Sequence, residues 1–365
     1  MTAGTEGGKG PLHDVRVLEL GSLGPGPFGC MLLADMGADV IRVDRPGAAH
    51  PAGDVLLRGR RSVVIDLKSD DGKVFLAELI ASCDVLCEGF RPGVLERLGF
   101  DPERCLQLNP RLVIARVTGW GQNGPLADTV GHDINYAGVA GVIHAIGPTG
   151  GDPVIPLNLV ADGGGGWMLA FGVMCGLWES RGSGRGQVID VAMLDASALM
   201  MAKWFGEYAA GSWRDERGMN RIDGGSHFYH IYRTADGRHL SVGAIETKFY
   251  ETFMSLLGFD VATLPDQHDR GAWPEMTGRV AALIAEQPLQ HWVETFEGHE
   301  VCVTPVSSLS EATQGNHARA RQTFVEVDGI VQPGAAPRFD RTPGSVGRIP
   351  ELGEHTAEVR AEFTR

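Results

Sequence analysis

Hydrophobic runs and helical periodicities alternate regularly along the first half of the chain. Short apolar runs, typical of buried strands, occur at 15–20, 39–43, 62–67, 84–87 and 112–117. Between them, apolar residues recur at helical spacing at 28–36, 73–82 and 94–98. Strands that alternate with helices predict βαβ units, and therefore an α/β fold whose mainly parallel sheet carries helices on both faces.

Later segments predict a second, smaller domain. A glycine run at 163–166 opens an apolar helical stretch to 178, with a turn expected at 180–186 and one more strand at 187–191. We therefore expect a large α/β domain over 1–195, a linker over 196–225 and a small α+β domain over 226–310, with strands at 228–233 and 239–242. The segment 311–365, rich in Pro, Gly and Arg, is predicted to return as an extended strap on the large domain.

Composition narrows the class of protein. The 365 residues are 43% hydrophobic and 21% charged, the balance of a soluble globular chain. A net charge of −14 without any basic run makes nucleic acid an unexpected partner. No apolar leader and no apolar run long enough to span a membrane occurs, so we expect a cytoplasmic protein without membrane contact. The six cysteines include no CxxC pair, and we expect buried free thiols rather than a metal site or disulfides.

The segment GPGPFG at 24–29 matches the dinucleotide-binding pattern G-x-G-x-x-G, and Asp44 follows near the place of a ribose-binding acid. Taken alone, this motif leaves a nicotinamide-dependent dehydrogenase open. However, Pro25 and Pro27 remove two of the backbone N–H donors that the pattern serves to aim at a pyrophosphate. We interpret the segment as a rigid turn that enters a helix.

Several further motifs occur in order along nearly the whole chain. They are VRVLEL at 15–20, ADMGADVIRVDRP at 34–46, DLKS at 66–69, EGFRPGV at 88–94, TGWGQ at 118–122, GHDINY at 131–136, LNLVAD at 157–162, GAIE at 243–246, CVTPV at 302–306 and GEHT at 353–356. Together they resemble the family III CoA-transferase (CaiB/BaiF) superfamily and, within it, the α-methylacyl-CoA racemases.

This resemblance implies a Rossmann-like large domain and an interlocked homodimer, with the active site where one subunit's large domain meets the other's small domain. It implies no cofactor, because CoA is part of the acyl-CoA thioester substrate. Arginine and lysine at 45, 68, 91 and 97 would supply positive potential for the CoA phosphates. The implied CoA contacts are Arg45, Ile65, Asp66, Leu67, Lys68, Gly89, Phe90, Arg91, Arg97, Gly131, His132, Asp133, Ile134, Asn135 and Tyr136.

Racemisation next to a thioester carbonyl needs two groups, one on each face of the carbon, because one proton leaves and another returns on the opposite side. The resemblance assigns these roles to His132 and Asp162, with Glu246 orienting the histidine. The backbone N–H of Asp133 and those of residues 163–166 are candidate donors to the enolate oxygen. Without the resemblance, His132 would be a packed or capping histidine, Asp162 a helix N-cap and Glu246 a surface acid.

The alternative within the superfamily is a CoA-transferase, which would use Asp162 as a nucleophile to move CoA between carboxylic acids. His132 favours the racemase, because transferases typically carry an aromatic residue at this place of the G-H-D segment. Four apolar side chains, Met193, Met200, Met201 and Trp204, are either core residues or an adaptable wall for the acyl group.

Overall fold

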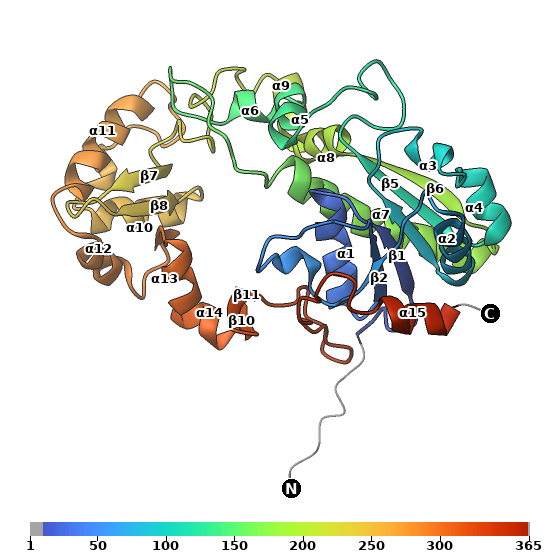
Figure 1. Cartoon of the computed structure of the whole chain (residues 1–365). Coiled ribbons are helices and arrows are strands. Elements are labelled where there is room, and N and C mark those ends of the chain that lie inside the picture. Colours follow the sequence, from blue (N-terminus) through green and yellow to red (C-terminus); the bar gives the residue numbers. More distant parts are fainter. Residues whose placement is uncertain (1–9, 364–365) are drawn as a thin grey trace, which may run out of the picture. The chain divides into compact units, whose positions relative to one another are not determined.

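The computed structural model describes residues 10–363, which form two compact units (Figure 1). The large unit comprises the chain up to Ala140, then Leu157–Met200, and the chain from Asn316 onward. The small unit comprises Gly141–Pro156 and Met201–Gly315. The segment 141–156, placed with the large domain by the sequence analysis, therefore belongs to the small unit by its contacts.

A six-stranded, all-parallel sheet forms the centre of the large unit, in the order β3-β2-β1-β4-β5-β6. The strands are β1 (Arg16–Leu20), β2 (Asp39–Asp44), β3 (Arg60–Val64), β4 (Val85–Glu88), β5 (Val113–Thr118) and β6 (Gln187–Ala192). This is the doubly wound order of Rossmann-type folds, in which the direction of winding reverses between β1 and β4. The predicted α/β fold with a parallel sheet is confirmed.

Helices cover both faces of this sheet, as its sequence pattern requires. In β1, Val17 and Leu18 are both fully buried but belong to different core clusters, because neighbouring side chains of a strand point to opposite faces. One cluster includes residues of α1 (Pro25–Asp35) and α7 (Ala161–Ser183). The other includes residues of α2 (Asp70–Ser82), α3 (Val94–Arg97), α4 (Pro102–Leu108) and α15 (Thr356–Phe363).

Helix α7 is longer than its sequence pattern predicts. The predicted turn at 180–186 is wrong in its first half, because the helix continues through Ser183 and ends where Gly184 adopts a φ of 76°. Glycine lets α7 approach α1 closely: a Cβ on Gly29 would lie 2.9 Å from the carbonyl oxygen of Gly166. The long glycine-rich helix therefore packs directly on the helix that follows β1.

Most of the buried charged side chains of the large unit form ion pairs. Glu19 accepts hydrogen bonds from Arg42 at 2.5 Å and from Arg60 at 2.6 Å. Arg58, only 1% exposed, donates to both carboxylate oxygens of Asp35 at 3.0 and 2.5 Å. Glu19, Arg42 and Arg60 belong to β1, β2 and β3, so their hydrogen bonds join three neighbouring strands of the sheet.

The segment after 315 is not a simply extended strap. It contains α14 (Asn316–Ala320), a hairpin of β10 (Phe324–Val327) and β11 (Ile330–Pro333), and then α15. Along the free edge of β3, the backbone N–H of Ser62 donates to His355 at 3.1 Å and that of Val64 donates to Thr356 at 3.0 Å. The GEHT motif therefore satisfies the hydrogen bonds of an edge strand.

The small unit is built on the three-stranded antiparallel sheet β7 (Tyr229–Arg233), β8 (His239–Gly243) and β9 (Val303–Pro305). Its main helices are α9 (Ala202–Ala209), α10 (Thr247–Leu256), α11 (Trp273–Ile284), α12 (Leu289–Phe296) and α13 (Leu309–Gln314). A separate aromatic core, which includes Phe228, Phe253 and Trp292, holds these elements together. The expected smaller α+β domain is thus present.

Two further features of the structure bear on the sequence predictions: the exposure of the cysteines and the apolar character of the helices. Of the six cysteines, all free thiols, four are buried, but Cys175 and Cys302 are exposed, which corrects the expectation that all are buried. Within residues 10–363, no helix combines the length and the apolar character needed to cross a bilayer.

Candidate active site

Two cavities open at the carboxyl ends of the strands, on either side of the point between β1 and β4 where the direction of winding reverses. The loops after β1 and β4 contribute to both, because Ser22, Leu23 and Phe90 line each of them. Open α/β sheets bind ligands in this crevice, since the connections on its two sides lead to opposite faces of the sheet. We call the cavity of about 840 Å³ the catalytic cavity and that of about 470 Å³ the outer cavity.

His132 and Asp162 both line the catalytic cavity. His132 is the exposed residue that precedes α5 (Asp133–Val139), and its backbone N–H donates to Asn135 Oδ1 at 3.0 Å. Asp162 is the second residue of α7, not its N-cap. Two helix N-termini from separate parts of the chain thus bring an imidazole and a carboxyl group to one cavity.

The carboxyl group of Asp162 is half-buried, and its pKa is raised above the ordinary value. Burial raises its pKa, the hydrogen bond from Asn158 at 3.1 Å opposes this, the charge of Asp133 raises it further, and His132 lowers it. Gly24, with a φ of 70°, leaves room for this group, since a Cβ there would lie 3.0 Å from Asp162 Oδ1. A carboxyl group with a raised pKa is suited to deliver a proton near neutral pH.

Tyr136 forms part of the wall of the catalytic cavity. Its ring lies edge-on to Trp120, with the ring centroids 4.7 Å apart, and fits against Gly119, where a Cβ would lie 2.1 Å from the Tyr136 ring. Burial and the charge of Asp162 raise the pKa of Tyr136, and Arg91 lowers it. The phenol is therefore a neutral donor on the wall of the site.

Cations without partners surround the two cavities. Arg45 and Lys68 line the outer cavity, and Arg91 lines the catalytic cavity. Within the described part of the chain, the side chains of these three residues and of Arg97 form no ion pair or hydrogen bond, whereas Arg42 beside them is bound by Glu19 and Asp44. Unpaired arginine and lysine beside a cleft are suited to bind phosphate groups.

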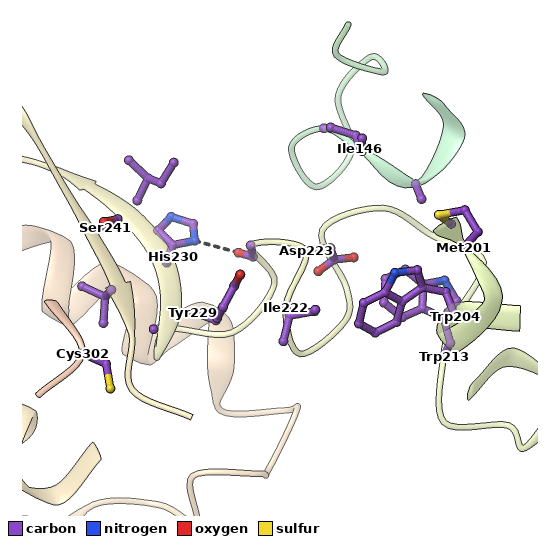
Figure 2. A pocket seen from close by; sticks show the side chains of 16 residues that line it. Ile146, Met201, Trp204, Trp213, Ile222, Asp223, Tyr229, His230, Ser241 and Cys302 are labelled. Atoms are coloured by element: carbon purple, nitrogen blue, oxygen red, sulfur yellow. Dashed lines mark hydrogen bonds between the residues drawn. The ribbon is translucent and has the colours of Figure 1, made fainter. Parts of the chain in front are cut away.

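The small unit contains a cavity of its own, of about 720 Å³, with largely aromatic and aliphatic walls (Figure 2). Trp204 and Trp213 lie beside each other there, with ring centroids 5.0 Å apart, and Met201 and Cys302 also contribute to the wall. Glu246, the residue that precedes α10, is exposed in the same unit. The pKa of Cys302 is raised, mainly by burial and to a smaller extent by the charge of Glu246.

The four apolar residues proposed as a wall do not line one cavity. Met193 lines the catalytic cavity, Met201 and Trp204 line the cavity of the small unit, and Met200 is 57% exposed. The chain changes from one unit to the other between Met200 and Met201. Within α8 (Met193–Met200), only the first methionine therefore contributes to the catalytic cavity.

Most of the residues implied as CoA contacts lie along the two cavities. Those on the walls are Arg45, Ile65, Asp66, Leu67, Lys68, Gly89, Phe90, Arg91, Gly131, His132, Asn135 and Tyr136. Asp133 is buried, while Arg97 and Ile134 are exposed and do not line either cavity. Glu246 belongs to the small unit.

One group of candidate donors is not free. The N–H of Gly163 donates to the carbonyl of Asn158 at 3.2 Å, and that of Gly164 donates to Val160 at 2.9 Å. These two amides already donate to carbonyls of residues that precede α7, so they are not free donors for an enolate oxygen. Asp133 is the first residue of α5, so its N–H has no partner inside that helix and stays a candidate.

Three residues around the catalytic cavity are not among the site residues predicted from the sequence: Asn158, Gly24 and Trp120. The spacing of Asn158 and Asp162 in LNLVAD, four residues, could have indicated their contact. Gly24 and Trp120 lie in the segments GPGPFG and TGWGQ, which form the loops after β1 and β5, but neither segment assigns a role to these two residues.

A doubly wound sheet with an acid–base pair and unpaired cations at its switch point defines a class: an α/β protein that binds an anionic ligand beside groups able to transfer protons. The chain belongs to CoA-transferase family III, whose model matches residues 12–356.

Two relatives are similar over nearly their whole length. The chain is 44% identical over 357 residues to the alpha-methylacyl-CoA racemase of Mus musculus, and 43% identical over 356 residues to that of Homo sapiens. Each match covers 96% of this chain and 93% of the relative. Among solved structures, a CAIB/BAIF family protein from Brucella suis matches with a TM-score of 0.83 and 26% identity, over 97% of this chain and 100% of that chain.

Proposed function

We propose that this protein is a racemase that interconverts the two C2 epimers of 2-methylacyl-CoA thioesters. The observation that carries the proposal is that His132 and Asp162 line one cavity, beside a groove with unpaired cations. The high identity to two racemases over nearly the whole chain supports the same activity.

In this proposal CoA lies along the outer cavity, with Arg45 and Lys68 at its phosphates, and extends past Phe90 into the catalytic cavity. Ser22, Leu23 and Phe90 line both cavities, so one extended ligand can occupy the two. The thioester carbonyl then lies near His132 and Asp162, where the N–H of Asp133 donates to its oxygen.

The reaction is a 1,1-proton transfer. In one direction His132 removes the C2 proton, the negative charge develops on the thioester oxygen, and Asp162 delivers its own proton to the opposite face of C2. The products are the inverted thioester, a protonated imidazole and an ionised carboxylate, which exchange protons with water before the next turnover. The raised pKa of Asp162 supports this role, because the carboxyl group must hold a proton at the start.

The remaining features belong to the same proposal. Glu246 orients His132 from the partner subunit of a homodimer, and the enzyme works in the cytoplasm, in fatty-acid metabolism, without a cofactor other than the CoA of its substrate. An apolar stripe on α7 supports self-association: Trp167, Phe171, Met174 and Trp178 recur at helical spacing and are 52%, 71%, 40% and 83% exposed.

The experiment is isotope exchange with a single epimer of 2-methylacyl-CoA in deuterated water. We expect deuterium at C2 together with epimerisation, and loss of racemisation in both His132→Ala and Asp162→Ala. Asp195→Ala, which removes an exposed acid of α8, serves as the matched control and should keep the activity. Transfer of CoA to a free carboxylate without exchange at C2 would instead establish the transferase alternative.

A further inference from the structure

The first turn of α7 is held by a side chain from another helix. Val160, which precedes α7, provides no side-chain cap. Instead, Asp133 Oδ2 accepts hydrogen bonds from the backbone N–H of Ala161 at 2.8 Å and of Asp162 at 2.9 Å. Asp133 directly follows His132 in the chain. Its carboxylate therefore links the start of α5, beside His132, to the backbone N–H of Asp162.

This carboxylate caps α7 with only one of its two oxygens. Asp133 is only 7% exposed, and its second oxygen, Oδ1, is buried without a hydrogen-bond partner among residues 10–363. An unpaired buried oxygen on a charged group costs stability, whereas a neutral side chain could accept from the same two N–H groups without that charge. Capping alone does not account for an ionisable group here.

We propose that the side chain of Asp133 is a positioning group for the reaction, which fixes the N-termini of α5 and α7 against each other and so sets the separation of His132 and Asp162. This role differs from that of its backbone N–H and rests on the proposed racemase function. A pair of groups that must act on opposite faces of one carbon tolerates little error in its spacing.

The charge of Asp133 gives the arrangement a second effect. The polar groups that face Asp162 are His132, Asp133 and Tyr136, together with the neutral amide of Asn158. Of the acids and bases in this set, Asp133 raises the pKa of Asp162 through its charge, in the direction opposite to His132. Position and proton affinity of Asp162 thus depend on the same neighbour.

Two neutral variants separate these effects, assayed by C2 deuterium exchange across a pH series. Asp133→Asn keeps an oxygen that accepts from both N–H groups, and we expect kcat at the optimum within about threefold of wild type, with the pH profile displaced downward by about one unit. Asp133→Ala removes both hydrogen bonds, and we expect the same displacement together with a fall in kcat of about 100-fold and little change in KM. Asp195→Asn, the charge-matched control, should change neither quantity.

The outcomes are distinguishable. Wild-type kcat in Asp133→Ala, with exchange in the wild type, would refute the positioning role and leave the racemase function standing. An unmoved pH profile in both Asp133 variants would refute the effect of its charge on Asp162. Absence of exchange in the wild type would refute the racemase function and this inference with it. If Asp133→Asn does not fold, as judged by circular dichroism, Asp133→Ser provides a neutral acceptor of smaller size for the same pH series.

Discussion

Arg58 is the best place to test how the large unit is held together. Its guanidinium donates twice to Asp35, once to Gln332 Oε1 at 2.8 Å and once to the carbonyl of Pro333 at 2.8 Å. Arg58→Ala would leave Asp35, 2% exposed, as a buried charge without its partner. Loss of one partner of a buried ion pair costs about 3–5 kcal/mol, and the freed oxygens of the β11 segment belong to the same network, so their cost is not added in full. We expect a loss of about 4 kcal/mol.

The pH dependence gives this prediction a sign. Burial raises the pKa of Asp35, and Arg58 opposes that rise, so the pKa of Asp35 increases further in Arg58→Ala. A carboxyl group whose pKa is higher in the folded than in the unfolded state takes up a proton on folding as the pH falls. The variant should therefore lose less stability at pH 5 than at pH 8.

Urea unfolding followed by circular dichroism at both pH values measures the two quantities. The double variant Asp35→Leu/Arg58→Met, which replaces the pair by apolar side chains, should recover most of the loss. A deficit for Arg58→Ala below about 1 kcal/mol, or one that is equal at the two pH values, would contradict the assignment of an uncompensated buried carboxylate.

Two further predictions concern the outer cavity and the small unit. Lys68→Ala should raise the KM for acyl-CoA about tenfold with kcat unchanged, because an ammonium–phosphate contact is lost far from the proton-transfer groups. The control Lys73→Ala on α2, outside the cavity, should leave both KM and kcat unchanged. Equal KM values in the two variants would exclude a phosphate contact by Lys68. Burial lowers the pKa of His227 to about 4, so as the pH falls the unfolded chain binds a proton before the folded one does. The free energy of unfolding of the small unit should therefore fall by about 2 kcal/mol between pH 7 and pH 5. His227→Gln should reduce this fall in urea unfolding followed by tryptophan fluorescence, and an unchanged fall would point to another group.

The main architecture could be predicted from the sequence because the strands β1 to β5 of the large unit are buried on both faces. Such strands give continuous apolar runs, and each predicted strand of the large unit has a counterpart within a few residues, from β1 to β6. The end of α7 was misplaced because residues 180–183 combine serine, arginine and glycine, which favour a turn locally. Packing of Ser180, 4% exposed and bonded through its hydroxyl to the carbonyl of Arg111, extends the helix instead.

The candidate site was predictable only in part. The motifs that resemble a known family include His132, Asp162 and most of the cavity residues. In the structure these residues lie along two adjoining cavities. The side-chain role of Asp133 has no local signature, because its partners, Ala161 and Asp162, lie 28 and 29 residues away in sequence. The β10–β11 hairpin was not predicted because its local sequence is misleading. Its short strands are partly exposed and lie in a segment rich in proline and glycine.

The core of the large unit joins segments that are far apart in the sequence. Val359 and Phe363 of α15 belong to the same core cluster as Leu18 and Ile41. Contacts of such long sequence separation slow folding, because the entropy of closing the loop between them is lost before the contact forms. Until α15 and the GEHT segment pack on the sheet, the edge of β3 is open to pairing with strands of other chains.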